Sequence, residues 1–193
     1  MASAIRRTWG KVLGVAFTAA MLTISGVLAI SIFSKVRMRA SFRAFADAVT
    51  SLQMISPRWS RPVATATIAA ETVVLALVVW PRGAPVGLAA AVLLFGLFAV
   101  VLARAVRRES TTGCHCFGAT SAPVAWRHVM RSGLLALASF GALLGAIAAP
   151  AMSLGSLDPP QLLLAVFTAG MVVAALVWLD DLTWLLRGAT HAR

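Results

Sequence analysis

Residues 12–34 read VLGVAFTAAMLTISGVLAISIFS, a run of 23 residues without an ionisable side chain. Lys11 precedes this run and Lys35 follows it, so a positive charge marks each end. A helix needs roughly 20 apolar residues to cross the hydrocarbon core of a bilayer, which is about 30 Å thick. The apolar part of a cleaved signal peptide is shorter, about 7–15 residues. The stretch therefore predicts a helix that permanently spans a membrane.

Four further stretches of similar length and apolarity follow, each bounded by charged residues, proline or glycine. They cover about residues 62–80, 85–106, 129–149 and 161–186. The link at residues 80–85 is short and contains Pro81, Gly83 and Pro85, which predicts an antiparallel hairpin of two spans. We therefore predict an all-α fold, a polytopic membrane helical bundle with five transmembrane helices, in which residues 1–193 form a single integral-membrane domain.

An amphipathic helix is predicted between the first and second spans. Apolar residues recur there at helical spacing, while three arginines occupy the polar positions. These are Phe42, Phe45, Val49, Leu52 and Ile55 on one side, and Arg37, Arg39 and Arg43 on the other. The segment is too poor in apolar residues to cross the bilayer, so we expect it to lie at the interface or against the bundle.

The overall composition supports a membrane protein and excludes several other classes. Hydrophobic residues make up 60% of the chain and charged residues 12%, and the mean hydropathy is +0.90. Soluble domains contain roughly 45–50% apolar and about 25% charged residues. The net charge of +11 does not indicate nucleic-acid binding, because the basic residues flank the apolar runs, where they face lipid headgroups. Two cysteines also exclude a disulfide-rich scaffold.

The basic residues are divided unevenly between the two sides of a five-span topology. The N-terminal segment and the second and fourth connections carry four, and the remaining connections and the C-terminal segment carry 13. The positive-inside rule would then place the third connection in the cytoplasm. Six of the 13 lie in the first connection and belong partly to the amphipathic helix, which can bind headgroups on either leaflet.

The third connection holds both cysteines of the chain, in residues 112–118, which read TGCHCFG. Closing a disulfide between Cys114 and Cys116 requires a bent backbone, and Gly113 and Gly118 permit a sharp bend. So small a ring removes little chain entropy, so the bond would be comparatively easy to reduce. A protonated His115 would favour the thiolate form of its neighbours. The pattern suits thiol–disulfide exchange better than structural cross-linking.

Other interpretations of the same residues are a soft-metal site and simple packing. Thiolates and imidazole bind Cu(I) or Zn(II), but a closed zinc site needs a fourth ligand, and the other histidines are His128 and His191. Free cysteines also pack well in apolar surroundings. No cofactor motif is evident, so a quinone is not supported and no cofactor is predicted.

Glu71 is predicted near the middle of the second span, where an ionised carboxylate costs about 3 kcal/mol. It must therefore be neutral or paired. It could accept a proton or anchor polar contacts near the cysteine connection, or it could hydrogen-bond a hydroxyl of the first span such as Thr23 or Ser25.

Several other residues suit the boundaries and contacts of a helical bundle. Gly141 and Gly145 predict close helix packing in the fourth span. Asp180 and Asp181 are predicted at the interface. Six tryptophans near span ends are typical interface anchors, namely Trp9, Trp59, Trp80, Trp126, Trp178 and Trp184.

The cysteine stretch and its surroundings resemble the methylamine utilisation protein MauE family, within the wider DoxX-like group of small membrane proteins. The resemblance covers about residues 10–150 and leaves the helix at about 161–186 as an extra C-terminal element. It is carried by these residues: Cys114-His115-Cys116-Phe117-Gly118, then Pro123-Val124 and Trp126, with Lys35 closing the first span, the Phe-rich amphipathic stretch and Glu71.

The resemblance implies a membrane factor for the maturation of an exported, disulfide-containing protein such as an amine dehydrogenase subunit. Cys114, His115 and Cys116 would carry thiol–disulfide oxidoreductase chemistry, with Phe117, Gly118 and Glu71 supporting them. A thioredoxin-like partner resembling MauD would exchange with the pair. The chain would lie in the cell membrane with the cysteine connection outside, where disulfides persist. The alternatives are a soft-metal handling protein and a non-catalytic assembly scaffold.

Overall fold

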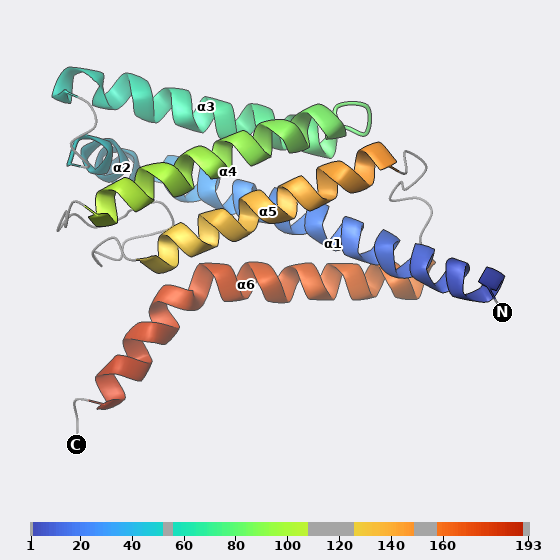
Figure 1. The fold of residues 1–193 in the computed structure, drawn as a ribbon. Helices are drawn as coiled ribbons and strands as arrows, with labels where there is room; N and C mark the ends of the chain where they lie inside the picture. Colours follow the sequence, from blue (N-terminus) through green and yellow to red (C-terminus); the bar gives the residue numbers. More distant parts are fainter. Residues whose placement is uncertain (1, 52–55, 108–125, 149–157, 191–193) are drawn as a thin grey trace.

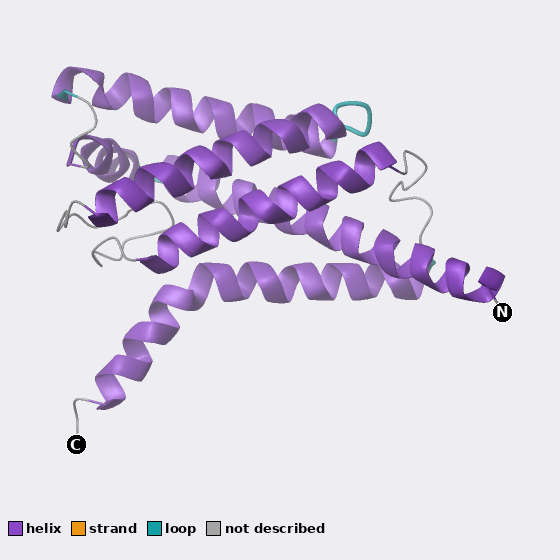
Figure 2. Cartoon of the chain, in the orientation of Figure 1, coloured by secondary structure: helices purple, strands orange, loops and turns teal. Residues whose placement is uncertain are grey.

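The computed structural model describes residues 2–51, 56–107, 126–148 and 158–190, and these segments form a bundle of helices (Figure 1). No strand occurs in these ranges, as Figure 2 shows. The elements are α1 (Ala2–Val36), α2 (Arg39–Ser51), the short 3-10 helix η1 (Pro57–Trp59), α3 (Ser60–Val79), α4 (Ala84–Arg107), α5 (Trp126–Ala148) and α6 (Pro159–Thr190). Five of them, all except α2 and η1, are long and apolar enough to cross a membrane. The predicted all-α membrane bundle is thus confirmed.

The helix boundaries follow the proline and charge signals of the sequence. α3 ends at Val79 because Trp80 takes an extended conformation, with φ −80° and ψ 117°, as expected of a residue that precedes proline. α1 differs most from the prediction, since its helix begins at Ala2, well before the apolar run. Lys11 therefore lies on a helical turn, and its ammonium pairs with Asp158 at 3.1 Å across an exposed contact with the start of α6.

The predicted hairpin of α3 and α4 is confirmed, and one glycine allows its two helices to meet closely. The turn is closed by a hydrogen bond of 2.9 Å from the Gly83 amide to the Trp80 carbonyl. A Cβ atom at Gly87 would lie only 2.6 Å from the backbone nitrogen of Val78. The two backbones therefore touch at Gly87, and a larger residue there would force them apart.

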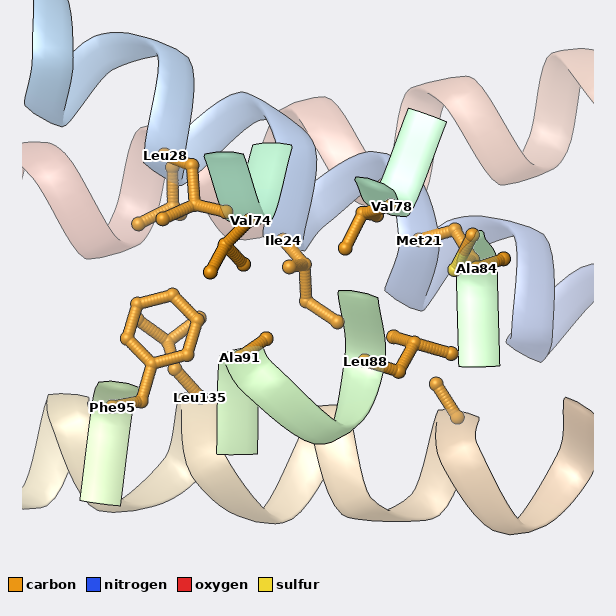
Figure 3. Packing of buried hydrophobic residues seen from close by; sticks show 12 residues of the cluster. Met21, Ile24, Leu28, Val74, Val78, Ala84, Leu88, Ala91, Phe95 and Leu135 are labelled. Atoms are coloured by element: carbon orange, nitrogen blue, oxygen red, sulfur yellow. The ribbon is translucent and has the colours of Figure 1, made fainter. Parts of the chain in front are cut away.

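The apolar core lies between α1, α3, α4 and α5 (Figure 3). Ile24 and Leu28 of α1 meet Val78 of α3 and Leu88 of α4 there, and all four side chains are almost completely buried. Large apolar side chains such as Leu93 face outward instead. An apolar exterior around a packed interior is the arrangement expected when the surrounding solvent is lipid.

Two predicted details of packing have different outcomes. Gly145 does lie at a helix contact, because a Cβ atom there would be 3.4 Å from the ring of Phe17 in α1. The prediction was wrong for Gly141, which has open space around it, because α5 turns that face away from the bundle. A close approach that was not predicted joins α1 to α6, where a Cβ atom at Gly26 would lie 3.3 Å from a methyl group of Val173.

The α2 helix lies at one end of the bundle and is amphipathic, as predicted (Figure 1). Arg37 precedes this helix, and Leu52 and Ile55 of the predicted segment lie outside the described residues. Phe45 and Ala46 are buried against Ala64 of α3, and Arg39 and Arg43 are exposed. We call this end, formed by residues 36–51, 56–61, 104–107 and 126–127, the α2 end. The opposite end, formed by residues 10–11, 79–84 and 158, is the hairpin end.

Candidate functional site

The predicted redox residues Cys114, His115, Cys116, Phe117 and Gly118 lie outside the described residues. The structure does describe the two points between which this connection runs. α4 ends at Arg107 and α5 begins at Trp126, and these two helices pack against each other as antiparallel neighbours (Figure 1). Both points belong to the α2 end, so the connection begins and ends there.

The same half of the bundle contains a buried ion pair between Lys35 of α1 and Glu71 of α3. The Lys35 Nζ and Glu71 Oε1 atoms are 2.5 Å apart, and the two side chains are 2% and 1% exposed. A charge at this depth is costly unless it is compensated. Each side chain supplies the compensating charge for the other, which explains how both remain inside the span.

Ser31 completes this polar cluster. Its hydroxyl lies one helical turn before Lys35, accepts a hydrogen bond of 3.0 Å from Lys35 Nζ and donates to the Glu71 carboxylate at 3.3 Å. All three residues are buried. Hydrogen bonds to charged groups in a site of low dielectric are strong, so the serine strengthens the link between α1 and α3.

Two aromatic rings flank the Lys35 ammonium. Its Nζ lies 4.6 Å from the ring centre of Phe45 in α2 and 5.8 Å from that of Phe98 in α4. The negative face of an aromatic ring attracts a cation, by about 2 kcal/mol or more when the contact is desolvated. One ammonium group therefore contacts side chains from α2, α3 and α4 in addition to Ser31 of its own helix.

This arrangement meets the requirement that Glu71 be neutral or paired, but with other partners than those considered from the sequence. The hydroxyl that bonds Glu71 belongs to Ser31, whereas Thr23 donates to the backbone carbonyl of Ala19 in its own helix. The register of α1 against α3 brings Ser31 and Lys35 to the level of Glu71. The helical period of the sequence did indicate that Ser31 and Lys35 face the bundle, because they follow apolar residues at spacings of three and four. The four residues of this buried stripe of α1 are Ile24, Leu28, Ser31 and Lys35.

Arg131 in α5 is a second buried cation, and it is one of the 13 basic residues on the more basic side of the predicted topology. Its side chain is only 6% exposed, and its Nη1 donates a hydrogen bond of 2.7 Å to the backbone carbonyl of Leu176 in α6. Arg131 therefore does not face headgroups. It joins α5 to the C-terminal helix instead.

The described residues include no group of three or more His, Cys, Asp and Glu side chains placed to hold a metal ion. The cysteine stretch lies outside these residues. The arrangement that is described, a closed cluster of one cation, one anion, one hydroxyl and two rings, suits the positioning of four helices.

No curated protein and no solved structure is detectably similar to the chain. A family model, described as methylamine utilisation protein MauE, matches residues 12–146. This range runs from the first span to α5 and so includes the ion pair and the cysteine connection, whereas α6 follows it. The match covers well over half of a chain that has five membrane-crossing helices, and the chain, a multi-pass membrane protein, therefore belongs to the methylamine utilisation protein MauE family.

Proposed function

We propose that the chain is a membrane thiol–disulfide relay for the maturation of an exported protein, with Cys114 and Cys116 as its reactive pair. The observation that carries the proposal is the Cys114-His115-Cys116 triplet within the residues that match the family. It is a feature that neither membrane insertion nor packing requires. Membership of a family named for methylamine utilisation supports an amine dehydrogenase subunit as the class of client.

The proposed reaction is balanced entirely by thiols and disulfides. A thiolate of the client attacks the Cys114–Cys116 disulfide, and a mixed disulfide forms. The client's second thiol then resolves the mixed disulfide, so the client gains a disulfide while Cys114 and Cys116 become thiols. A thioredoxin-like partner in its disulfide form reoxidises the pair by the same exchange and leaves as a dithiol.

Residues near Cys114 and Cys116 in the sequence favour thiol–disulfide exchange. His115 in its protonated form stabilises an adjacent thiolate, which is the attacking and leaving species in exchange. Arg107, exposed at the last turn of α4, adds positive potential where the connection begins. Phe117 and Gly118 shape the connection, and the short disulfide ring keeps the bond easy to reduce.

We assign the buried ion pair a positioning role in this relay. Lys35 holds α2 and α3 together, and through Phe98 it also contacts α4, nine residues before Arg107, where the cysteine connection begins. A rigid frame improves reactions that need precise approach of two sulfur atoms. Glu71 thereby supports the cysteines through helix placement rather than through contact with the client.

The proposal places the chain in the cell membrane with the α2 end outside. Disulfides persist outside the cytoplasm, and an exported client meets the relay there. Two of the basic residues that argue for the opposite orientation, Lys35 and Arg131, are buried in the bundle and do not contribute to a headgroup-facing surface.

The proposal is tested by exchange with a purified thioredoxin-like protein in its disulfide form. The full chain in nanodiscs should be oxidised by it, and Cys114→Ser alone should abolish the exchange. A chain carrying both Cys114→Ser and Cys116→Ser serves in a second assay, in cells, where the client's disulfides are counted.

Two results would contradict the relay. If the double variant still supports full oxidation of the client, the chain acts as an assembly scaffold. If the wild-type chain retains copper or zinc in proportion to its thiolates and exchanges with no thioredoxin-like protein, it handles soft metals.

A further inference from the structure

Exposed arginines gather in pairs at the α2 end of the bundle. Each pair lies on consecutive helical turns: Arg39 and Arg43 in α2, Arg58 and Arg61 around the start of α3, and Arg104 and Arg107 at the end of α4. All six side chains are exposed, and so is that of Arg37, which precedes α2. Among the described residues of this end, Asp47 is the only exposed acidic one.

The hairpin end has a different charge. The basic residues with exposed side chains at this end are Lys11 and Arg82, and the ammonium of Lys11 pairs with the Asp158 carboxylate at 3.1 Å. Arg6 and Arg7 precede Lys11 in α1 at the same end of the bundle. With Arg6 and Arg7 included, the hairpin side carries four basic residues, whereas the α2 end carries eight. Each end of the bundle is expected to meet one of the two headgroup layers of the membrane, so the two layers would meet different amounts of positive charge.

Tryptophan side chains indicate that the arginines lie at headgroup depth. Trp59 and Trp126 are 63% and 52% exposed at the α2 end, and Trp80 is 57% exposed at the hairpin end. Exposed tryptophan at the ends of spans marks the membrane–water interface. Arg58 and Arg61 lie one and two residues from Trp59 in sequence, so their guanidinium groups lie within reach of the same layer.

The chemistry of the side chains indicates the ligand. The chain has 15 arginines and only two lysines, and neither lysine belongs to these pairs, because Lys11 is at the hairpin end and Lys35 is buried. Arginine presents a planar fork of donors that binds phosphate oxygens in a bidentate manner, whereas lysine acts as a point charge.

The orientation of α2 also suits a lipid surface. Phe45 and Ala48 are buried toward the bundle, so the helix is fixed with Arg39 and Arg43 one turn apart on its exposed side. A basic face held beside apolar spans attracts anionic lipids by both charge and position.

We propose that the α2 end is a binding surface for the phosphate groups of anionic phospholipids. This goes beyond the relay and does not depend on it. Anionic phospholipids can be bound in either leaflet. The arginines are therefore compatible with an α2 end outside the cell, although the positive-inside rule alone would place that end in the cytoplasm.

The test measures lipid retention by the full chain with native mass spectrometry, after purification in micelles that contain equal amounts of phosphatidylglycerol and phosphatidylcholine. The wild-type chain should retain phosphatidylglycerol preferentially. Arg39→Gln with Arg43→Gln should lower that preference about thirtyfold, since each basic residue near a surface contributes about 1 kcal/mol, or about fivefold, and two are removed. Lys11→Gln with Arg82→Gln removes the same formal charge from the hairpin end and should leave the preference unchanged.

Unfolding curves in phosphatidylcholine alone verify that each variant is folded, and Arg104→Gln with Arg107→Gln replaces the first pair if that variant is unstable. Equal retention of the two lipids by the wild-type chain would overturn the proposal. Equal losses in the α2-end and hairpin-end variants would also overturn it, since they would indicate a bulk charge effect. Displacement of phosphatidylglycerol by millimolar glycerol phosphate would instead identify a soluble phosphate as the ligand.

Discussion

Removing one member of the Lys35–Glu71 pair should be among the most damaging single changes outside the cysteine connection. The two charged atoms are 2.5 Å apart and the side chains are 2% and 1% exposed, so Lys35→Met leaves the carboxylate buried with Ser31 as its remaining described partner. Breaking a buried ion pair from one side costs about 3–5 kcal/mol of unfolding free energy. We expect Lys35→Met and Glu71→Met each to lose an amount in that range.

The double variant, Lys35→Met with Glu71→Met, should be far more stable than either single variant. Two apolar side chains of similar length leave no charge in this cluster, and such replacements are often neutral or stabilising by about 1–4 kcal/mol. The hydroxyl of Ser31 can then bond to a carbonyl of its own helix, as Thr23 already does with Ala19. The expected coupling energy between the two positions is therefore at least about 3 kcal/mol.

The assay is equilibrium unfolding of the purified chain in mixed micelles by a denaturing detergent, evaluated as a double-mutant cycle. Lys11→Met is the matched control, because Lys11 also pairs with a carboxylate but both partners are 61% exposed. An exposed pair contributes only about 0–1 kcal/mol. The reasoning would be refuted if the losses of unfolding free energy in Lys35→Met and Glu71→Met simply added in the double variant. It would also be refuted if Lys35→Met lost no more unfolding free energy than Lys11→Met.

Two further predictions concern helix contacts. Gly87→Val should lower the unfolding free energy by about 1–3 kcal/mol or more, because its side chain would displace the backbone of α3, whereas Gly96→Ala, with open space at Cβ, should be neutral or stabilising in the same unfolding assay. Arg131→Met should lower it by about 1.5–3 kcal/mol, because the charged hydrogen bond to Leu176 is lost. A disulfide or chemical cross-link placed between α5 and α6 should then form less efficiently, while the exposed Arg104→Met should leave both readouts unchanged. Equal effects at positions 87 and 96, or at 131 and 104, would contradict these assignments.

The membrane fold could be predicted from the sequence because each span carries its own signal. The length of the apolar runs, the flanking charges and the prolines predicted the positions of all five long helices, and the helical period predicted α2. These features depend only on residues close together in the chain. The exceptions were local extensions. α1 continues past the apolar run to Ala2, and Lys11 in this extension pairs with Asp158.

The partners of the buried charges could not be predicted in the same way. The position of Glu71 in a span indicated that it must be neutral or paired. Its pairing with Lys35 and Ser31 depends on the register of α1 against α3, which no local sequence pattern specifies. Lys35 was interpreted as the charge that closes the first span. Gly141 shows the converse, because a motif typical of close packing only packs if the rotation of α5 turns it inward.

Differential alkylation of Cys114 and Cys116 in intact cells tests the central claim most directly. A thiol reagent that does not cross membranes is applied with and without prior reduction, and the labelled chain is then isolated and quantified. The relay predicts that labelling from outside rises sharply after reduction, because the pair rests as a disulfide on the exterior. Labelling that requires permeabilised cells and no reductant would contradict the account, since it would place free thiols in the cytoplasm.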